Sequence, residues 1–237
     1  MRCRASCRRT PRTRRPFGHP RRRVEDRLDR EEGGRSFRIL LVDDDEIFLG
    51  VLAWSAFDPH DYPTWWLEVT PALLALGVIL WTRHSFPLTP LLYLLVLVHA
   101  VILMVGGHYT YALVPWFDWL WELIGSERNN YDKIGHLAQG FIPAIAAREI
   151  LLRFGVVKGK GWLAFLVVCF CLALSAFYEL LEWWVALLSE EAAESFLGTQ
   201  GYVWDTQSDM WYALLGAVLA LVLLSKLHDR QLEALSR

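Results

Sequence analysis

The sequence has little cysteine, which limits the kinds of site it can build. Its four cysteines are Cys3 and Cys7 near the N-terminus, and Cys169 and Cys171 within one hydrophobic segment. This spacing is not that of a disulfide framework, and with no histidine pair nearby it gives little support to a structural zinc site. We therefore expect Cys169 and Cys171 to be small core residues.

Positive charge is scarce after the first 38 residues. Those residues hold 14 of the 24 Lys and Arg side chains and 5 of the 26 acidic ones, which leaves 10 bases against 21 acids in the remainder. The basic stretch has few large apolar side chains, so we expect it to be disordered. Arginine runs of this kind bind nucleic acid or anionic lipid, but we expect no nucleic-acid partner for the rest of the chain. No apolar stretch typical of a signal peptide follows it.

These features divide the chain into an Arg-rich tail, residues 1–46, and a membrane helix bundle, residues 47–237. The segment 47–57 is apolar but too short to span a bilayer. Four acidic residues precede it directly, each costing ~2.5–3.5 kcal/mol at mid-membrane. We expect a short, incomplete or interfacial helix there, and we interpret the tail as an extension that is not the ancestral N-terminus.

Long hydrophobic runs dominate the rest of the sequence. Hydrophobic residues make up 54% of the chain, and they gather in runs of about 20, the length that crosses ~30 Å of hydrocarbon. The expected fold is an all-α, polytopic transmembrane helix bundle with about five to six spans. The five clearest spans are 66–81, 87–106, 132–152, 161–188 and 204–224.

The charges of the short loops predict the orientation of the bundle. Basic residues that flank alternate span ends should be cytoplasmic: Arg83, Arg148, Arg153, Lys158, Lys160, Lys226 and Arg230. The intervening loops are acidic and should face outward. We therefore expect a multi-pass protein of the bacterial inner membrane with a cytoplasmic C-terminus.

Ionisable residues inside spans are costly, so each is a functional hypothesis. Helical spacing places several of them on common faces: Asp132, His136 and Gln139; Glu179 and Glu182; Asp205 and Asp209. Another group, His108, Tyr109 and Tyr111, closes the span 87–106. The predicted topology puts all of these groups within ~12 Å of the outer surface, at a rise of 1.5 Å per residue. We expect the other half of the bundle to be almost purely apolar.

Such a set of side chains can serve three purposes. Histidine and carboxylate oxygens can bind a divalent metal, here through His136, Glu179 and Asp209. The same groups, with Asp132, can carry out acid–base catalysis. They can also form a hydrogen-bonded core that fixes the helix register. Mid-span His99 is expected to make an interhelical hydrogen bond and not to act as a ligand.

Several motifs resemble the YjdF-like family of bacterial inner-membrane proteins over residues 50–235. They are SAFDPHD at 55–61, TWWLEV at 64–69, FPLT at 86–89, GHYTY at 107–111, NYDKIGH at 130–136, FYELLEW at 177–183, GTQG at 198–201 and WDTQSDM at 204–210. The resemblance implies about six spans and names no substrate.

A second, fainter resemblance is to the VanZ-like membrane proteins linked to glycopeptide resistance. Asp132-Lys133-x-x-His136 is similar to the motif that opens one of their spans, and Asp205-x3-Asp209-x6-Gly216 is similar to a closing motif. Ala213 stands where that motif would place Asn. The resemblance implies a role in the cell envelope.

We therefore expect an outward-facing polar pocket that acts on head groups of lipids or envelope precursors. Asp132, His136, Glu179 and Asp209 are the candidate catalytic residues. The candidate binding residues are His108, Tyr109, Tyr111, Gln139, Glu182 and Asp205. A proton- or cation-coupled transporter and a structural assembly factor remain alternatives.

Overall fold

The computed structural model describes residues 46–115, 129–188 and 203–236. The chain divides into two compact units, Met1–Leu40 and Leu41–Arg237, and every described residue belongs to the second. The expected disordered tail therefore lies outside the described residues, apart from Glu46. The expected acidic outward loops lie largely outside them as well, because 116–128 and 189–202 are not described.

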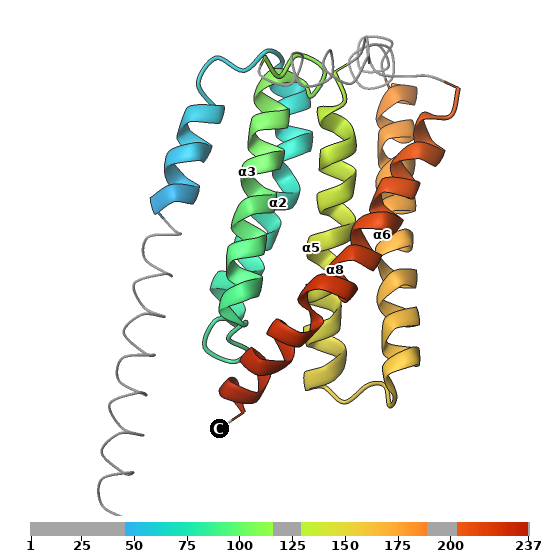
Figure 1. The fold of residues 1–237 in the computed structure, drawn as a ribbon. Coiled ribbons are helices and arrows are strands. Elements are labelled where there is room, and N and C mark those ends of the chain that lie inside the picture. The colour runs from blue at the N-terminus through green and yellow to red at the C-terminus, as the bar shows by residue number, and fades with distance from the viewer. Residues whose placement is uncertain (1–45, 116–128, 189–202, 237) are drawn as a thin grey trace, which may run out of the picture. The chain divides into compact units, whose positions relative to one another are not determined.

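The described part of the chain is all α-helical, which confirms the predicted fold class (Figure 1). The long helices are α2 (Tyr62–Thr82), α3 (Pro90–Tyr109), α5 (Tyr131–Arg153), α6 (Lys160–Leu188) and α8 (Asp205–Leu235). A short apolar helix, Glu46–Ser55, precedes them and matches the segment predicted to be too short to span.

Local sequence explains where α2 and α3 begin. Asp61 caps α2, its carboxylate accepting a hydrogen bond of 2.8 Å from the backbone N–H of Thr64. Thr89 caps α3 in the same way, through Leu92. A proline occupies the first turn of each helix, where its missing N–H removes no helical hydrogen bond. Capping and proline together define the residue at which each helix starts.

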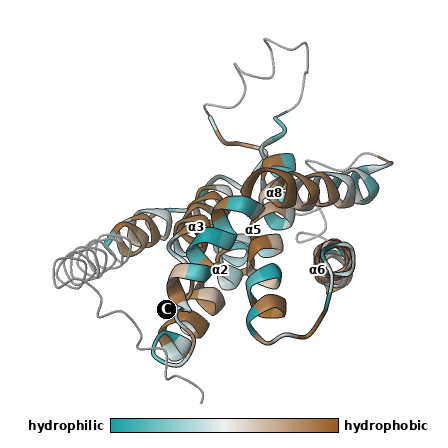
Figure 2. Cartoon of the chain, turned by 60° about the horizontal axis from the view of Figure 1, so that its bottom comes forward, coloured by the Kyte–Doolittle hydropathy of each residue, from teal (hydrophilic) through white to brown (hydrophobic). Residues whose placement is uncertain are grey.

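Four helices, α2, α3, α6 and α8, are long and apolar enough to cross a membrane. Large hydrophobic side chains cover their outer faces, including Trp81, Leu188 and Val222, which are 86%, 84% and 72% exposed. Figure 2 shows hydrophobic residues along most of α3 and α8. Such a surface is stable in lipid and would aggregate in water.

Helix α5 is more polar and lies within the bundle, packed against α3, α6 and α8. Its contact with α8 is especially close. A side chain at Gly140 would collide with the backbone of Ala213, and one at Gly216 would collide with the carbonyl oxygen of Leu137. Small residues allow this approach of two backbones, as in other membrane helix pairs. The close contact buries the polar face of α5 away from lipid.

The helices alternate in direction, so that one end of the bundle collects the starts of α2, α5 and α8 and the ends of α3 and α6 (Figure 1). We call this the site end. At the opposite end, α8 continues to Leu235, beyond the predicted end of the apolar span at residue 224. Lys226 to Leu235 continue the helix past the apolar run, as the polar turns of long membrane helices often do outside the hydrocarbon.

Candidate functional site

The site is centred on His136, in the second turn of α5, whose two ring nitrogens face different carboxylates. Nε2 lies 3.3 Å from Asp132 of the same helix and 3.9 Å from Asp209 of α8. Nδ1 lies 3.9 Å from Glu179 of α6. The ring is 5% exposed. Three helices thus bring acids to one buried imidazole.

Gln139 lies beside the same ring. Its side-chain oxygen lies 3.2 Å from Nδ1 of His136, while Nε2 faces Asp132 and Asp209. A histidine that binds a metal commonly donates its second ring N–H to an oxygen, and Gln139 lies where it can accept that bond.

Two groups of side chains around His136 have the spacing of metal ligands. The first is Asp132, His136 and Asp209, and the second is His136, Glu179 and Glu182. Within each group the candidate ligand atoms lie within 4.8 Å of one another. Imidazole and carboxylate ligands suit Zn²⁺, Mn²⁺ or Fe²⁺.

Buried oxygen atoms with no hydrogen-bond partner lie beside the same histidine. Oδ1 of Asp209 and Oε1 of Glu179 are buried and accept no hydrogen bond from the described residues. Most buried carboxylate oxygens have a donor or a cation beside them, because burial without one is costly. Both carboxyl groups belong to the candidate ligand groups around His136.

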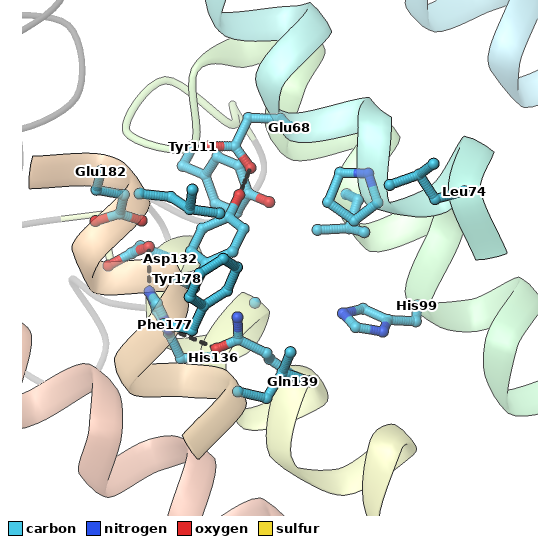
Figure 3. A pocket seen from close by; sticks show the side chains of 15 residues that line it. Glu68, Leu74, His99, Tyr111, Asp132, His136, Gln139, Phe177, Tyr178 and Glu182 are labelled. Atoms are coloured by element: carbon cyan, nitrogen blue, oxygen red, sulfur yellow. Dashed lines mark hydrogen bonds and ion pairs between the residues drawn. The ribbon is translucent and has the colours of Figure 1, made fainter. Parts of the chain in front are cut away.

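A cavity of about 290 Å³ adjoins this cluster, between α2, α3, α5 and α6. Figure 3 shows Asp132, His136 and Glu182 gathered on one wall, with Leu74 and His99 facing them. This volume is close to the lower limit of ~300–1,000 Å³ for small-molecule sites. The His136 cluster therefore opens onto a space that can hold a ligand.

Glu68 of α2 forms the upper part of the cavity, with two tyrosines. The phenol of Tyr178 on α6 donates a hydrogen bond of 2.9 Å to its carboxylate, and the phenol of Tyr111 also hydrogen-bonds to it. Neither Glu68 nor Tyr178 was predicted to be a site residue. Tyr178 lies beside the predicted Glu179, but adjacent helix positions point in different directions, so the sequence carried no sign of their shared site.

Tyr111 is held in place by a strained turn. Thr110 and Tyr111 have φ angles of 54° and 52°, in the left-handed region that costs non-glycine residues energy. Its ring fills the space beside Gly106, where a Cβ would collide with it, and lies in close contact with Gly135. Burial raises the pKa of the Tyr111 phenol well above its ordinary value, so the group stays a neutral hydrogen-bond donor.

The structure brings most of the predicted site residues together. Asp205 also lies close enough to Glu179 and Asp209 for their charges to interact. His108 and Tyr109 lie elsewhere: the His108 ring hydrogen-bonds the carbonyl oxygen of Ser55 at 3.0 Å, and both rings pack against Trp54.

In the described part of the chain, His99 does not make the interhelical hydrogen bond that was predicted for it. Its ring lines the cavity and makes no hydrogen bond within the described residues, so the predicted interhelical bond is not found there.

The expectation of an apolar opposite half is wrong. Glu149 of α5 is fully buried there and accepts hydrogen bonds from Thr89, from Arg153 at 2.9 Å and from His228 at 3.0 Å. Arg148 donates to Nδ1 of His228 at 2.8 Å. Glu149 lies within the predicted span 132–152, whereas His228 lies beyond the span predicted to end at residue 224.

An apolar core separates the two polar clusters. It is built from small and branched side chains of α5, α6 and α8, including Ala144, Ile145, Val167 and Ala217. These four residues are fully buried. In α5, the core residues Ala144 and Ile145 lie between His136 and Glu149.

Comparison with known proteins places the chain in a family. Residues 46–230 match the family described as "Predicted membrane protein (DUF2238)". The Inner membrane protein YjdF of Escherichia coli (strain K12) is 52% identical over 182 residues, which cover 77% of this chain and 87% of that protein. No solved structure matches. The chain is thus an integral membrane protein that belongs to the DUF2238 family, as its resemblance to YjdF-like proteins predicted.

Proposed function

We propose that this inner-membrane protein binds a divalent cation at His136, and that the bound site acts on the head group of a lipid or envelope precursor in the adjoining cavity. The observation that carries the proposal is the grouping of Asp132, His136 and Asp209 with their ligand atoms within 4.8 Å. The unsatisfied buried oxygen of Asp209 supports it.

Of the two candidate groups, the one that contains Asp132 and Asp209 is favoured. Gln139 occupies the Nδ1 side of the imidazole, and Nε2 faces the carboxylates of Asp132 and Asp209. Glu179 and Glu182 then remain as neighbouring carboxylates. In that position they can accept or hold a proton during a reaction.

When bound, a divalent cation supplies Lewis-acid polarisation and lowers the pKa of a coordinated water. The protein supplies position and proton transfer. Gln139 orients the imidazole of His136. Tyr111 and Tyr178 hydrogen-bond to the carboxyl group of Glu68 in the upper part of the cavity. The apolar core below the site excludes water. This combination suits hydrolysis or transfer at a polar head group.

The orientation follows from charge at the opposite end. Arg83, Lys158 and Lys160 lie in or beside the short connections at that end, and Arg153 closes α5 there. Basic residues next to short loops remain cytoplasmic. The site end then faces outward, and the C-terminus lies in the cytoplasm.

A proton- or cation-coupled carrier is the rival function, and it would use the same acids. It needs a polar path through the membrane in at least one conformation. The buried core that contains Ile145 and Val167 interrupts such a path. This arrangement favours a site used from one side.

The test is the divalent metal content of the purified, detergent-solubilised protein. His136→Ala and Asp209→Asn remove one ligand each, and Glu233→Gln, at an exposed position of the same helix α8, is the matched control. Size-exclusion chromatography checks that each variant is folded.

We expect a stoichiometric ion in the wild type and in Glu233→Gln, and its loss from both site variants while they remain folded. Metal retained by both folded site variants, or a folded wild type that binds none after incubation with Zn²⁺ or Mn²⁺, would overturn the proposal. Unfolding of both site variants with a metal-free wild type would favour a structural role for the cluster.

A further inference from the structure

The cavity beside the His136 cluster continues into an apolar region. Side chains of α2, α3 and α6 form its walls: Pro71, Leu74, Leu103, Leu174, Phe177 and Leu181. Leu174 lies 14 residues before the end of α6 at Leu188, which corresponds to ~21 Å along the helix. The cavity therefore extends from the site end toward the middle of the bundle.

One side of this apolar region faces the bilayer. Leu74 and Phe177 line the cavity and are nevertheless 64% and 49% exposed. They belong to α2 and α6, which are not among the helix pairs that pack extensively on each other. The hydrogen bond between Tyr178 and Glu68 joins these two helices nearer the site end, because Glu68 precedes Leu74 by ~9 Å along α2. A hydrocarbon chain from the bilayer can thus enter between α2 and α6 below that bond.

His99 of α3 lies in the apolar region without a hydrogen-bond partner among the described residues. It lines the cavity, and Figure 3 shows its ring directed into that space. An imidazole carries at least one N–H donor, and a polar group without a partner in apolar surroundings costs free energy. For this reason ionisable side chains inside membrane spans are rare and mark ligand sites. A ligand that fills the cavity should therefore place a hydrogen-bond acceptor beside His99.

The ring of Tyr111 shows how deep His99 lies relative to the polar cluster. This ring lies against both Gly106 of α3 and Gly135 of α5, so these two glycines have a similar depth. Going away from the site end, His99 comes seven residues after Gly106, and His136 comes one residue after Gly135. At 1.5 Å per residue, His99 is ~9 Å deeper than His136. A ligand that reaches both histidines needs a second polar group below its head group, as the ester carbonyl of a glycerolipid is.

We infer that the cavity binds a glycerolipid with an ester-linked acyl chain. The ester carbonyl accepts a hydrogen bond from the imidazole N–H of His99, the glycerol end points toward His136, and the acyl chain lies between α2 and α6. A plain hydrocarbon would leave the N–H of His99 without an acceptor. The inference deepens the proposed function by naming the ligand class, and it rests on that proposal only in placing a head group at the polar end. Recognition of the chain and the carbonyl requires neither a charged head group nor a bound cation.

The test compares two neutral probes that differ in one carbonyl group: monopalmitoylglycerol, whose chain is attached through an ester, and its hexadecyl ether analogue. Both are radiolabelled and titrated onto the purified full-length protein after removal of metal with a chelator. A steroid-based detergent is used, because it has no linear alkyl chain to compete. One hydrogen bond of ordinary strength should make the ester bind about three- to tenfold more tightly than the ether.

Variants test the two parts of the site separately. His99→Phe keeps a planar ring and removes the donor, so it should abolish the preference for the ester while the ether still binds. His84→Phe, at an exposed position outside the cavity, is the matched control and should keep the preference. Leu174→Trp fills the apolar region and should abolish binding of both probes, whereas Val222→Trp, on the exposed face of α8, should leave binding unchanged.

Equal affinities of the wild type for the two probes would overturn the inference, as would an ester preference that persists in folded His99→Phe or unchanged binding in folded Leu174→Trp. If His99→Phe does not fold, His99→Leu replaces it, and the probe comparison on the wild type can still fail without either variant.

Metal content is measured on the same preparations before the chelator is added, so that the two proposals fail separately. A protein that binds the cation but neither probe keeps the proposed cation site and loses this ligand class. A protein without a cation that prefers the ester through His99 keeps the ligand class and loses the cation site.

Discussion

At the scale of single residues, the proposed cation site depends on the two nitrogens of one imidazole. His136 faces Asp132 and Asp209 through Nε2, while Gln139 and Glu179 lie on its Nδ1 side. The sequence predicted that Gln139 shares a helical face with His136. It could not predict which nitrogen Gln139 contacts, because that depends on side-chain rotamers fixed by α6 and α8.

Replacing Gln139 tests its orienting role. Gln139→Leu should leave the fold intact and weaken cation affinity by ~10–100-fold, as the loss of other partners of metal-bound histidine does. Titration of the metal-free protein with Mn²⁺ measures the effect. Gln207→Leu, at an exposed position of α8 near the same end, should change nothing. Equal affinities for the two variants would show that Gln139 does not orient the ligand.

A second residue-scale prediction concerns the opposite end of the bundle. Glu149→Leu leaves Arg153 and the N–H of His228 without their buried acceptor. Removing one partner of a buried ionic network costs ~3–5 kcal/mol. We expect that loss in the free energy of unfolding, measured by denaturation in detergent micelles.

Glu233→Leu, at an exposed position of α8, is the control and should be nearly neutral. The Glu149 variant, where it folds, should still bind the cation, because the apolar core separates the two clusters. A neutral effect of Glu149→Leu would mean that the network does not stabilise the fold.

At the scale of helices, the sequence was most informative where apolar runs were long. The starts of α5 and α6 and the end of α6 agree with their predicted spans to within one residue. Helix α8 continues past the predicted end of its span, because hydropathy falls after Leu224 while the helix runs on. The opposite-end network could not be predicted, because His228 lies in this continuation and hydropathy gives no sign that it contacts Glu149.

The close packing of α5 on α8 can be tested by adding a side chain at Gly140. Gly140→Ala would place a methyl group against the backbone of Ala213. Overpacking of this kind costs ~1–3 kcal/mol or more, so we expect a lower thermal stability in detergent and a displaced Asp209.

Gly77→Ala in α2 is the matched control, because its added methyl group would meet nothing within 4 Å. It should be neutral or slightly stabilising, as alanine favours helix over glycine. Similar stabilities for the two variants would argue against the close packing of α5 on α8.

At the scale of the whole molecule, helix direction alone predicted that the polar groups share one end. Alternating spans place Asp132, Glu179 and Asp209 at similar depth, and the structure places them around one histidine. Their mutual contact could not be predicted, because depth does not define how each helix is rotated. The bond between Tyr178 and Glu68 depends on that rotation as well.

The proposed orientation has a direct test. A fluorescent protein fused after residue 237 should fold and fluoresce, whereas alkaline phosphatase at the same place should be inactive, because the first folds in the cytoplasm and the second outside it. Alkaline phosphatase inserted between residues 116 and 128 should be active. The reverse pattern would place the site end in the cytoplasm.

The central claim, that His136 coordinates a divalent cation, is tested most directly by pulsed electron paramagnetic resonance of the Mn²⁺-loaded protein. We expect a nitrogen coupling from a single imidazole in the wild type and in Glu233→Gln, and its disappearance in folded His136→Ala. Bound Mn²⁺ with no nitrogen coupling, or a coupling that survives in His136→Ala, would contradict the account.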